Sequence, residues 1–193
     1  MPNWCNNTVE LYHEDPVMIE RAREAFNKGA LLNEFIPVPQ ALRDTVSGSM
    51  GEDKREAHEA QQKANREQYG YANWYDFCVN EWGTKWDIGA DGYSADDIPG
   101  GLMLTFDSAW APPVAAYDKL EALGFTIRAM YYEPGMAFAG VYEDGHDDYY
   151  DYGGLNSEQI AEELPVELDE AFCISESVAE WEEENKEEEQ DET

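Results

Sequence analysis

The sequence predicts an α+β domain in which a split βαβ arrangement places two helices on one face of an antiparallel sheet. The first 142 residues alternate between strand and helix patterns in the order strand, helix, strand, strand, helix, strand, with one extra strand after them. The segments 102–106 and 125–131 place apolar residues at every second position, as strands covered by helices require. A chain of 193 residues is long enough for one such core and an appendage.

The first strand is predicted over 8–13, and a helix follows it. Asp15 is a preferred N-cap residue, Pro16 suits the first helical position and Gly29 ends the helix. This segment therefore supplies the first of the two helices that cover the sheet.

A helical insertion is predicted at about 51–82. Its first helix, over 52–68, is almost purely polar apart from an alanine stripe, so we expect it to pack loosely at the surface. Its second helix, over 72–82, is amphipathic. The side chains that share its apolar face are Trp74, Tyr75, Cys78 and Trp82.

The second half of the domain repeats the pattern. A strand is predicted over 85–93 and another over 102–106. Pro112 and Pro113 then open a helix that Gly124 closes. Two further strands are predicted over 125–132 and 137–142.

The chain becomes strongly acidic near its end. From Glu133 to Thr193 there are 22 acidic residues and one basic residue, so this third of the chain carries −21 of the formal net charge of −31. Residues 143–153 are predicted as an acidic, tyrosine-rich connection. Short helices around 160–164 and 167–172 and a last helix through Trp181 follow, with a frayed end.

Composition excludes several classes of protein. A net charge of −31 excludes a binder of duplex DNA or RNA that works by phosphate neutralisation, and an anionic membrane surface would repel the chain. Neither a secretory signal nor an apolar run long enough for a membrane span is present in the sequence. Cys5, Cys78 and Cys173 are far apart and odd in number, which predicts reduced thiols in a cytoplasm.

Four separated motifs carry a resemblance. They are Met1-Pro2-Asn3-Trp4-Cys5-Asn6-Asn7, Trp82-Gly83-Thr84-Lys85-Trp86-Asp87, Phe106-Asp107-Ser108-Ala109-Trp110-Ala111-Pro112-Pro113 and Tyr132-Glu133-Pro134-Gly135-Met136-Ala137-Phe138-Ala139-Gly140. In this order they resemble the ferredoxin-like domains of the plasmid protein YubB and its phage-encoded Api relatives. The resemblance covers roughly residues 1–143. It implies a ferredoxin-like fold and a home on the mobile elements of bacteria, hence the cytoplasm of a bacterial host, and it implies no defined activity.

The predicted domain organisation follows from these two regions. Residues 1–143 form the ferredoxin-like α+β domain with its helical insertion. Residues 144–193 form an acidic, partly helical C-terminal extension that the resemblance does not explain.

A first candidate site is an aromatic cleft lined with carboxylates. Such a cleft would suit the stacking of a sugar or a nucleotide and general acid–base chemistry. The residues that would form it are Trp4, Trp82, Lys85, Trp86, Asp87, Asp107, Trp110 and Glu133. The structural alternative, which we favour, is that the tryptophans are core or edge residues that cover the second face of the sheet, because large aromatic side chains bury the most area.

Other catalytic and metal chemistry has little support. His13, His58 and His146 have no neighbouring serine or cysteine motif, and there is no phosphate-binding Gly-Lys-Ser/Thr loop. The acidic residues 144–151 do not fit an EF-hand spacing, so we interpret them as a solvated loop. We therefore predict a non-enzymatic protein without a cofactor or a metal.

The acidic region supports a second site. Between Glu158 and Thr193 there are 16 acidic residues in 36. As a helix they would place about one charge per ~3.4 Å, close to the phosphate spacing of one DNA strand, although Pro165 prevents a single straight helix. This density predicts binding to a basic host protein, which the hypothesis extends to inhibition of a DNA-handling or defence complex by DNA mimicry. The alternative is a solubilising tail. The predicted contact residues are Asp147, Asp148, Asp151, Glu182, Glu183, Glu184, Glu187, Glu188 and Glu189.

Overall fold

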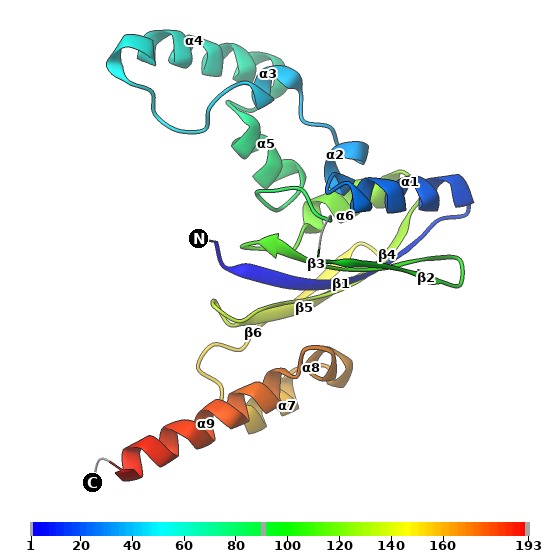
Figure 1. Cartoon of the computed structure of the whole chain (residues 1–193), viewed down its shortest axis with the longest axis vertical. Helices are drawn as coiled ribbons and strands as arrows, with labels where there is room; N and C mark the ends of the chain where they lie inside the picture. Colours follow the sequence, from blue (N-terminus) through cyan, green and yellow to red (C-terminus); the bar gives the residue numbers. More distant parts are fainter. Residues whose placement is uncertain (1, 90–91, 192–193) are drawn as a thin grey trace.

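A six-stranded antiparallel sheet forms the centre of the protein (Figure 1). The computed structural model describes residues 2–89 and 92–191, and side chains as far as residue 185. The strands are β1 (Trp4–Tyr12), β2 (Ser94–Ile98), β3 (Gly101–Ala109), β4 (Thr126–Glu133), β5 (Phe138–Glu143) and β6 (His146–Asp151). Their order, β2-β3-β1-β4-β5-β6, contains the strand order of a ferredoxin-like domain with a hairpin added beside β4. The predicted α+β class is confirmed.

Helices α1 (Pro16–Asn27) and α6 (Val114–Ala122) cover one face of this sheet. Leu11 of β1 lies opposite Leu102 of β3 and Ile127 of β4, so alternate strand positions form one buried layer. As predicted, Asp15 caps α1, because its carboxylate accepts a hydrogen bond from the Val17 N–H at 2.9 Å.

The helices inserted between α1 and β2 contribute Leu32, Leu42 and Cys78 to the hydrophobic core that lies on the sheet. They are α2 (Leu31–Phe35), α3 (Gln40–Arg43), α4 (Glu52–Tyr69) and α5 (Trp74–Glu81). Within the described chain, Asn65 is the one buried residue of the polar helix α4, which projects away from the sheet in Figure 1. The Asn65 amide donates to the Thr45 hydroxyl and to the Ala72 carbonyl, both at 2.9 Å, and so attaches α4 to its neighbours.

The opposite face of β4, β5 and β6 is covered by three C-terminal helices. They are α7 (Ser157–Glu163), α8 (Val166–Phe172) and α9 (Ile174–Asp191). Ile160, Leu164, Leu168 and Ile174 are buried there against Ala139 of β5. Pro165 separates α7 from α8, as expected. The expectation that tryptophans cover the second face is wrong for this half of the sheet, because helices occupy it.

Two segments differ from their predictions. Of the segment 85–93, the described residues 85–89 and 92–93 do not form a strand. Gly89 has φ +107°, and a Cβ atom there would lie 2.1 Å from the Phe26 carbonyl oxygen, so this loop presses against α1. The second strand of the sheet, β2, begins at Ser94. Residues 143–153, predicted as a connection, contain the end of β5 and the whole of β6.

No helix in the described ranges combines the length and the apolar character that a membrane crossing requires.

Candidate functional site

The four motifs of the sequence meet at one end of the sheet. Trp4 at the start of β1 pairs with Ala109 at the end of β3, and the Trp110 N–H donates to the Asn3 carbonyl at 3.0 Å. The Thr84 hydroxyl donates to the Ala109 carbonyl at 3.0 Å and accepts from its N–H at 3.1 Å. Asn6 pairs with Tyr132 of the fourth motif, so the first motif contacts residues more than a hundred positions away in the chain.

An exposed aromatic cluster surrounds Lys85 at this end. The Lys85 ammonium lies 4.6 Å from the ring centre of Trp86, 5.0 Å from that of Trp110 and 5.8 Å from that of Tyr75. Trp4 lies 5.8 Å from Trp86, between ring centres. Trp4, Trp86 and Trp110 are 44%, 40% and 42% exposed, which is unusual for such large side chains.

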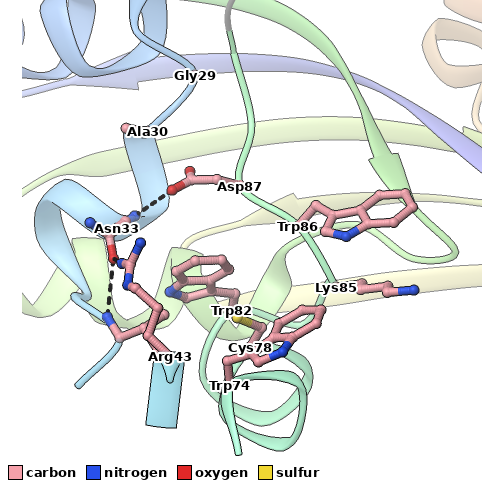
Figure 2. A pocket seen from close by; sticks show the side chains of 11 residues that line it. Gly29, Ala30, Asn33, Arg43, Trp74, Cys78, Trp82, Lys85, Trp86 and Asp87 are labelled. Atoms are coloured by element: carbon pink, nitrogen blue, oxygen red, sulfur yellow. Dashed lines mark hydrogen bonds between the residues drawn. The ribbon is translucent and has the colours of Figure 1, made fainter. Parts of the chain in front are cut away.

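Beside this cluster lies a pocket of about 280 Å³, between α2, α3, α5 and the loop after α5 (Figure 2). Three tryptophans, Trp74, Trp82 and Trp86, contribute its aromatic surface. In Figure 2, Trp82 lies between Arg43 and the other two tryptophans. Two cationic side chains, Arg43 and Lys85, line the same pocket.

Two of the predicted cleft residues hold the pocket in shape. Trp82 is buried, and its indole N–H donates to the Ile36 carbonyl at 3.0 Å. The Asp87 carboxylate accepts from the N–H groups of Leu32 at 2.7 Å and Asn33 at 3.0 Å, which satisfies the start of α2. Burial raises the pKa of Asp87, and these N–H bonds oppose the increase.

Asp107 and Glu133 lie away from this pocket, so the prediction of one carboxylate-lined cleft is wrong. Asp107 accepts a hydrogen bond from the Asn6 amide at 2.5 Å on the open sheet face. Glu133 is 1% exposed, and its two oxygens accept from the N–H groups of Gly135 at 2.8 Å and Met136 at 2.7 Å. Glu133 therefore stabilises the turn between β4 and β5.

The predicted aspartates of the acidic site lie on the edge strand β6. Asp147 accepts a hydrogen bond from the Tyr131 hydroxyl at 2.7 Å, and burial raises its pKa. Asp148 lies 3.1 Å from the His146 ring nitrogen, and Asp151 accepts from the Gly153 N–H at 2.9 Å. Alternation along β6 directs Asp147 and Asp151 toward the α6 side and Asp148 toward the opposite side.

The predicted glutamates of α9 differ in their surroundings. Glu182 accepts two hydrogen bonds from Ser157, so its carboxylate makes a structural contact within the fold. Glu183 and Glu184 are exposed. The side chains of Glu187, Glu188 and Glu189 lie outside the described part of the structure.

No model of a known protein family matches the chain, and no curated protein matches its sequence. Among solved structures, the chain is similar to protein api92 from Yersinia pseudotuberculosis, which is assigned to the DUF1281 family. The two chains are 14% identical, the likeness covers 80% of this chain and 99% of that chain, and the TM-score is 0.43. A likeness of this degree does not show family membership, so the relationship to the YubB and Api domains stays a prediction.

Three residues of the aromatic region were not among the predicted site residues. Trp74 and Tyr75 have a visible signal, because they lie on the same predicted helix face as Trp82. Arg43 has none, since it belongs to the four-residue helix α3 in a segment that is loop-like in sequence. Of the eight predicted cleft residues, Trp82, Lys85, Trp86 and Asp87 line the pocket, and Trp4 and Trp110 belong to the adjoining cluster.

Proposed function

We propose that the protein is a non-enzymatic binding protein that presents an acidic surface to a basic protein, at a place where that partner otherwise binds nucleic acid. One observation carries the proposal. Between Glu133 and Asn185 the chain has 17 acidic residues and no lysine or arginine. A solubilising tail requires no fixed structure, whereas most of these residues belong to strands and helices that pack on the sheet.

The exposed carboxylates of α7, α8 and α9 form what we name the acidic helix surface. It consists of Glu158, Glu162, Glu163, Glu167, Glu170, Glu176, Glu180, Glu183 and Glu184. Within the described side chains, the ion pair that reaches this surface from a basic residue joins Arg128 to Glu167 at 2.6 Å. The other carboxylates therefore remain available to cations of a partner.

The spacing of these charges supports the comparison with nucleic acid. Helix α9 has nine acidic residues among its 18, which corresponds to about one charge per ~3 Å at 1.5 Å per residue. One strand of duplex DNA presents a phosphate about every 3.4 Å. Because α7 and α8 fold back against α9, the surface is a compact layer and not the extended rod considered from sequence. Association driven by such charges is fast and weakens with salt.

The proposal is tested by capture from bacterial cytosol on the immobilised full-length protein, with elution by a salt gradient. We expect basic, nucleic-acid-binding proteins to be captured and to be displaced by added duplex DNA. A variant with Glu176, Glu180, Glu183 and Glu184 changed to Gln should release them at a lower salt concentration.

The matched control removes the same number of charges from another exposed helix. It changes Glu52, Glu56, Glu59 and Glu67 of α4 to Gln. Equal weakening by both variants would reduce the effect to net charge. Release from the α9 variant at the same salt concentration as from the wild type would overturn the proposal.

A second function is favoured by the aromatic pocket, namely binding of a small aromatic anion such as a nucleotide. Three tryptophan side chains line this pocket together with Arg43 and Lys85, and these cations suit a phosphate better than a neutral sugar. AMP should then raise the thermal unfolding temperature of the wild type, and Arg43→Gln should remove the increase. Absence of any shift with AMP, ADP or ATP would exclude this function.

A further inference from the structure

A second cavity, of about 390 Å³, lies between the segment that follows β3 and the strands β4, β5 and β6. Four aromatic side chains and one carboxylate contribute to its lining. They are Trp110, Tyr131, Phe138, Tyr149 and Asp147. Asp147 is the one charged residue that lines it within the described chain. The first pocket differs, because two cations, Arg43 and Lys85, line it together with the Asp87 carboxylate.

The rings of this cavity pack against one another and fix the carboxylate. Phe138 lies 5.3 Å from Tyr149 and 6.2 Å from Tyr131, between ring centres. Tyr131 is fully buried, and its hydroxyl donates to Asp147 Oδ1 at 2.7 Å. Asp147 is itself exposed, and this hydrogen bond holds its carboxylate beside the aromatic surface, where a ligand can reach it.

Trp110 is held at the mouth of the cavity by the backbone. It has φ +69°, a left-handed conformation that costs a residue other than glycine about 1–2 kcal/mol. Its N–H bond to the Asn3 carbonyl, at 3.0 Å, fixes that conformation. Trp110 and Tyr149 are 42% and 56% exposed, so both rings keep surface open to a ligand, and Lys85 lies 5.0 Å from the Trp110 ring centre.

We propose that this cavity binds the guanidinium group of an arginine side chain from the basic partner. The inference rests on the proposed function and deepens it by naming the side chain that is recognised. A guanidinium stacks on aromatic rings, donates directed hydrogen bonds to a carboxylate and is weakly hydrated. A lysine ammonium is more strongly hydrated and lacks the planar shape, so it gains less from the same surroundings.

Electrostatic attraction also favours binding of a guanidinium cation in this cavity. The net charge of −31 attracts cations to the whole surface, and the rings then select among them. Burial raises the pKa of Asp147, because its charge lacks full hydration, and a bound cation would offset this cost.

The test is a titration of the full-length protein, followed by tryptophan fluorescence, with N-acetyl-arginine amide, N-acetyl-citrulline amide and N-acetyl-lysine amide. We expect the arginine compound to bind at least ten times more tightly than the uncharged citrulline compound and several times more tightly than the lysine compound. Equal binding of all three, or of arginine and lysine, would overturn the proposal. N-acetyl-agmatine and an N-acetylated, C-amidated Gly-Arg-Gly peptide each carry a single positive charge. Tighter binding of N-acetyl-agmatine than of this peptide would indicate a small-molecule site and would also overturn the proposal.

Variants assign the binding to this cavity. Asp147→Asn, which can still accept from Tyr131, should weaken arginine-amide binding at least tenfold, and Tyr149→Ala should weaken it severalfold. Asp144→Asn removes one charge from the same hairpin at an exposed left-handed position that asparagine tolerates, and it should change binding less than twofold. Equal losses in Asp147→Asn and Asp144→Asn would overturn the proposal.

The two experiments distinguish failure of this cavity from failure of the acidic helix surface. If cytosolic proteins still bind with salt dependence but Asp147→Asn leaves both their capture and the arginine titration unchanged, the acidic helix surface acts without this cavity. If arginine amide binds while neutralisation of α9 has no effect on capture, the cavity stands and the helix surface fails.

Discussion

The Glu182 carboxylate joins the last helix of the chain to Ser157, the first residue of α7. One oxygen accepts from the Ser157 N–H at 3.0 Å and the other from its hydroxyl at 3.0 Å. The start of a helix carries unsatisfied N–H groups and a partial positive charge, so a carboxylate is well placed there. This pair orders the surface that we assign to partner binding.

We expect Glu182→Ala to lower the free energy of unfolding by about 1–2 kcal/mol, because it leaves the Ser157 groups without their charged acceptor. Chemical denaturation followed by circular dichroism measures the effect. Glu183→Ala, at the neighbouring exposed position, is the control and should stay within about 0.5 kcal/mol of the wild type. Equal values for both variants would contradict the structural role of Glu182.

Trp82 and Trp86 should differ sharply in their contribution to stability. Trp82→Ala removes a buried ring and leaves the Ile36 carbonyl without its donor, so we expect a loss of about 3–5 kcal/mol. Trp86→Ala removes a 40% exposed ring and should cost far less. Denaturant unfolding of both variants checks this, and a severe loss in Trp86→Ala would place that residue in the core.

Asp87 should give stability a defined dependence on pH. Its folded-state pKa is raised by burial, so its protonation favours the folded state. As the pH falls from 7 toward 4, the wild type should therefore gain stability relative to Asp87→Asn. Denaturation curves at several pH values measure the difference, and Asp144→Asn, at an exposed turn, should run parallel to the wild type. A gain by Asp87→Asn instead would refute the direction.

Thiol reactivity should separate the three cysteines. Burial raises the pKa of the Cys5 and Cys78 thiols to about 12, whereas Cys173 is exposed. A disulfide reagent should label about one thiol in the folded protein and three after denaturation. Rapid labelling of all three in the native state would show that the core opens.

A substitution at Cys173 should stabilise the folded protein. Cys173 ends α8 with φ +51°, where glycine is favoured. Cys173→Gly should therefore raise the free energy of unfolding by about 0.5–1 kcal/mol, measured by denaturation. Destabilisation would show that the Cys173 side chain makes a stabilising contact.

Apolar periodicity predicts the strands of the sheet correctly where it is strong. The segments around Leu11, Leu104 and Ile127 alternate clearly, and each is a strand of the buried layer. It misses β6, because His146-Asp147-Asp148-Tyr149-Tyr150-Asp151 owes its extended form to pairing with β5 and not to burial. Tertiary pairing of this kind leaves no local signal.

The candidate site could be predicted in part. The sequence groups Trp4, Trp86 and Trp110 with Lys85, and these side chains contact one another in the structure. Asp87, Glu133 and Glu182 are predicted as site residues, and each also accepts hydrogen bonds from backbone N–H groups in the fold. A sequence does not distinguish a carboxylate that faces solvent from one that satisfies its own chain.

The two edge strands of the sheet also influence aggregation. The outer strands, β2 and β6, expose aspartates, among them Asp96 and Asp148. A second copy that tried to extend the sheet would bring rows of like charge within about 4.8 Å of one another, the usual distance between paired strands. Edge-to-edge growth into fibres is therefore opposed at both borders, and a concentrated solution should stay free of such aggregates.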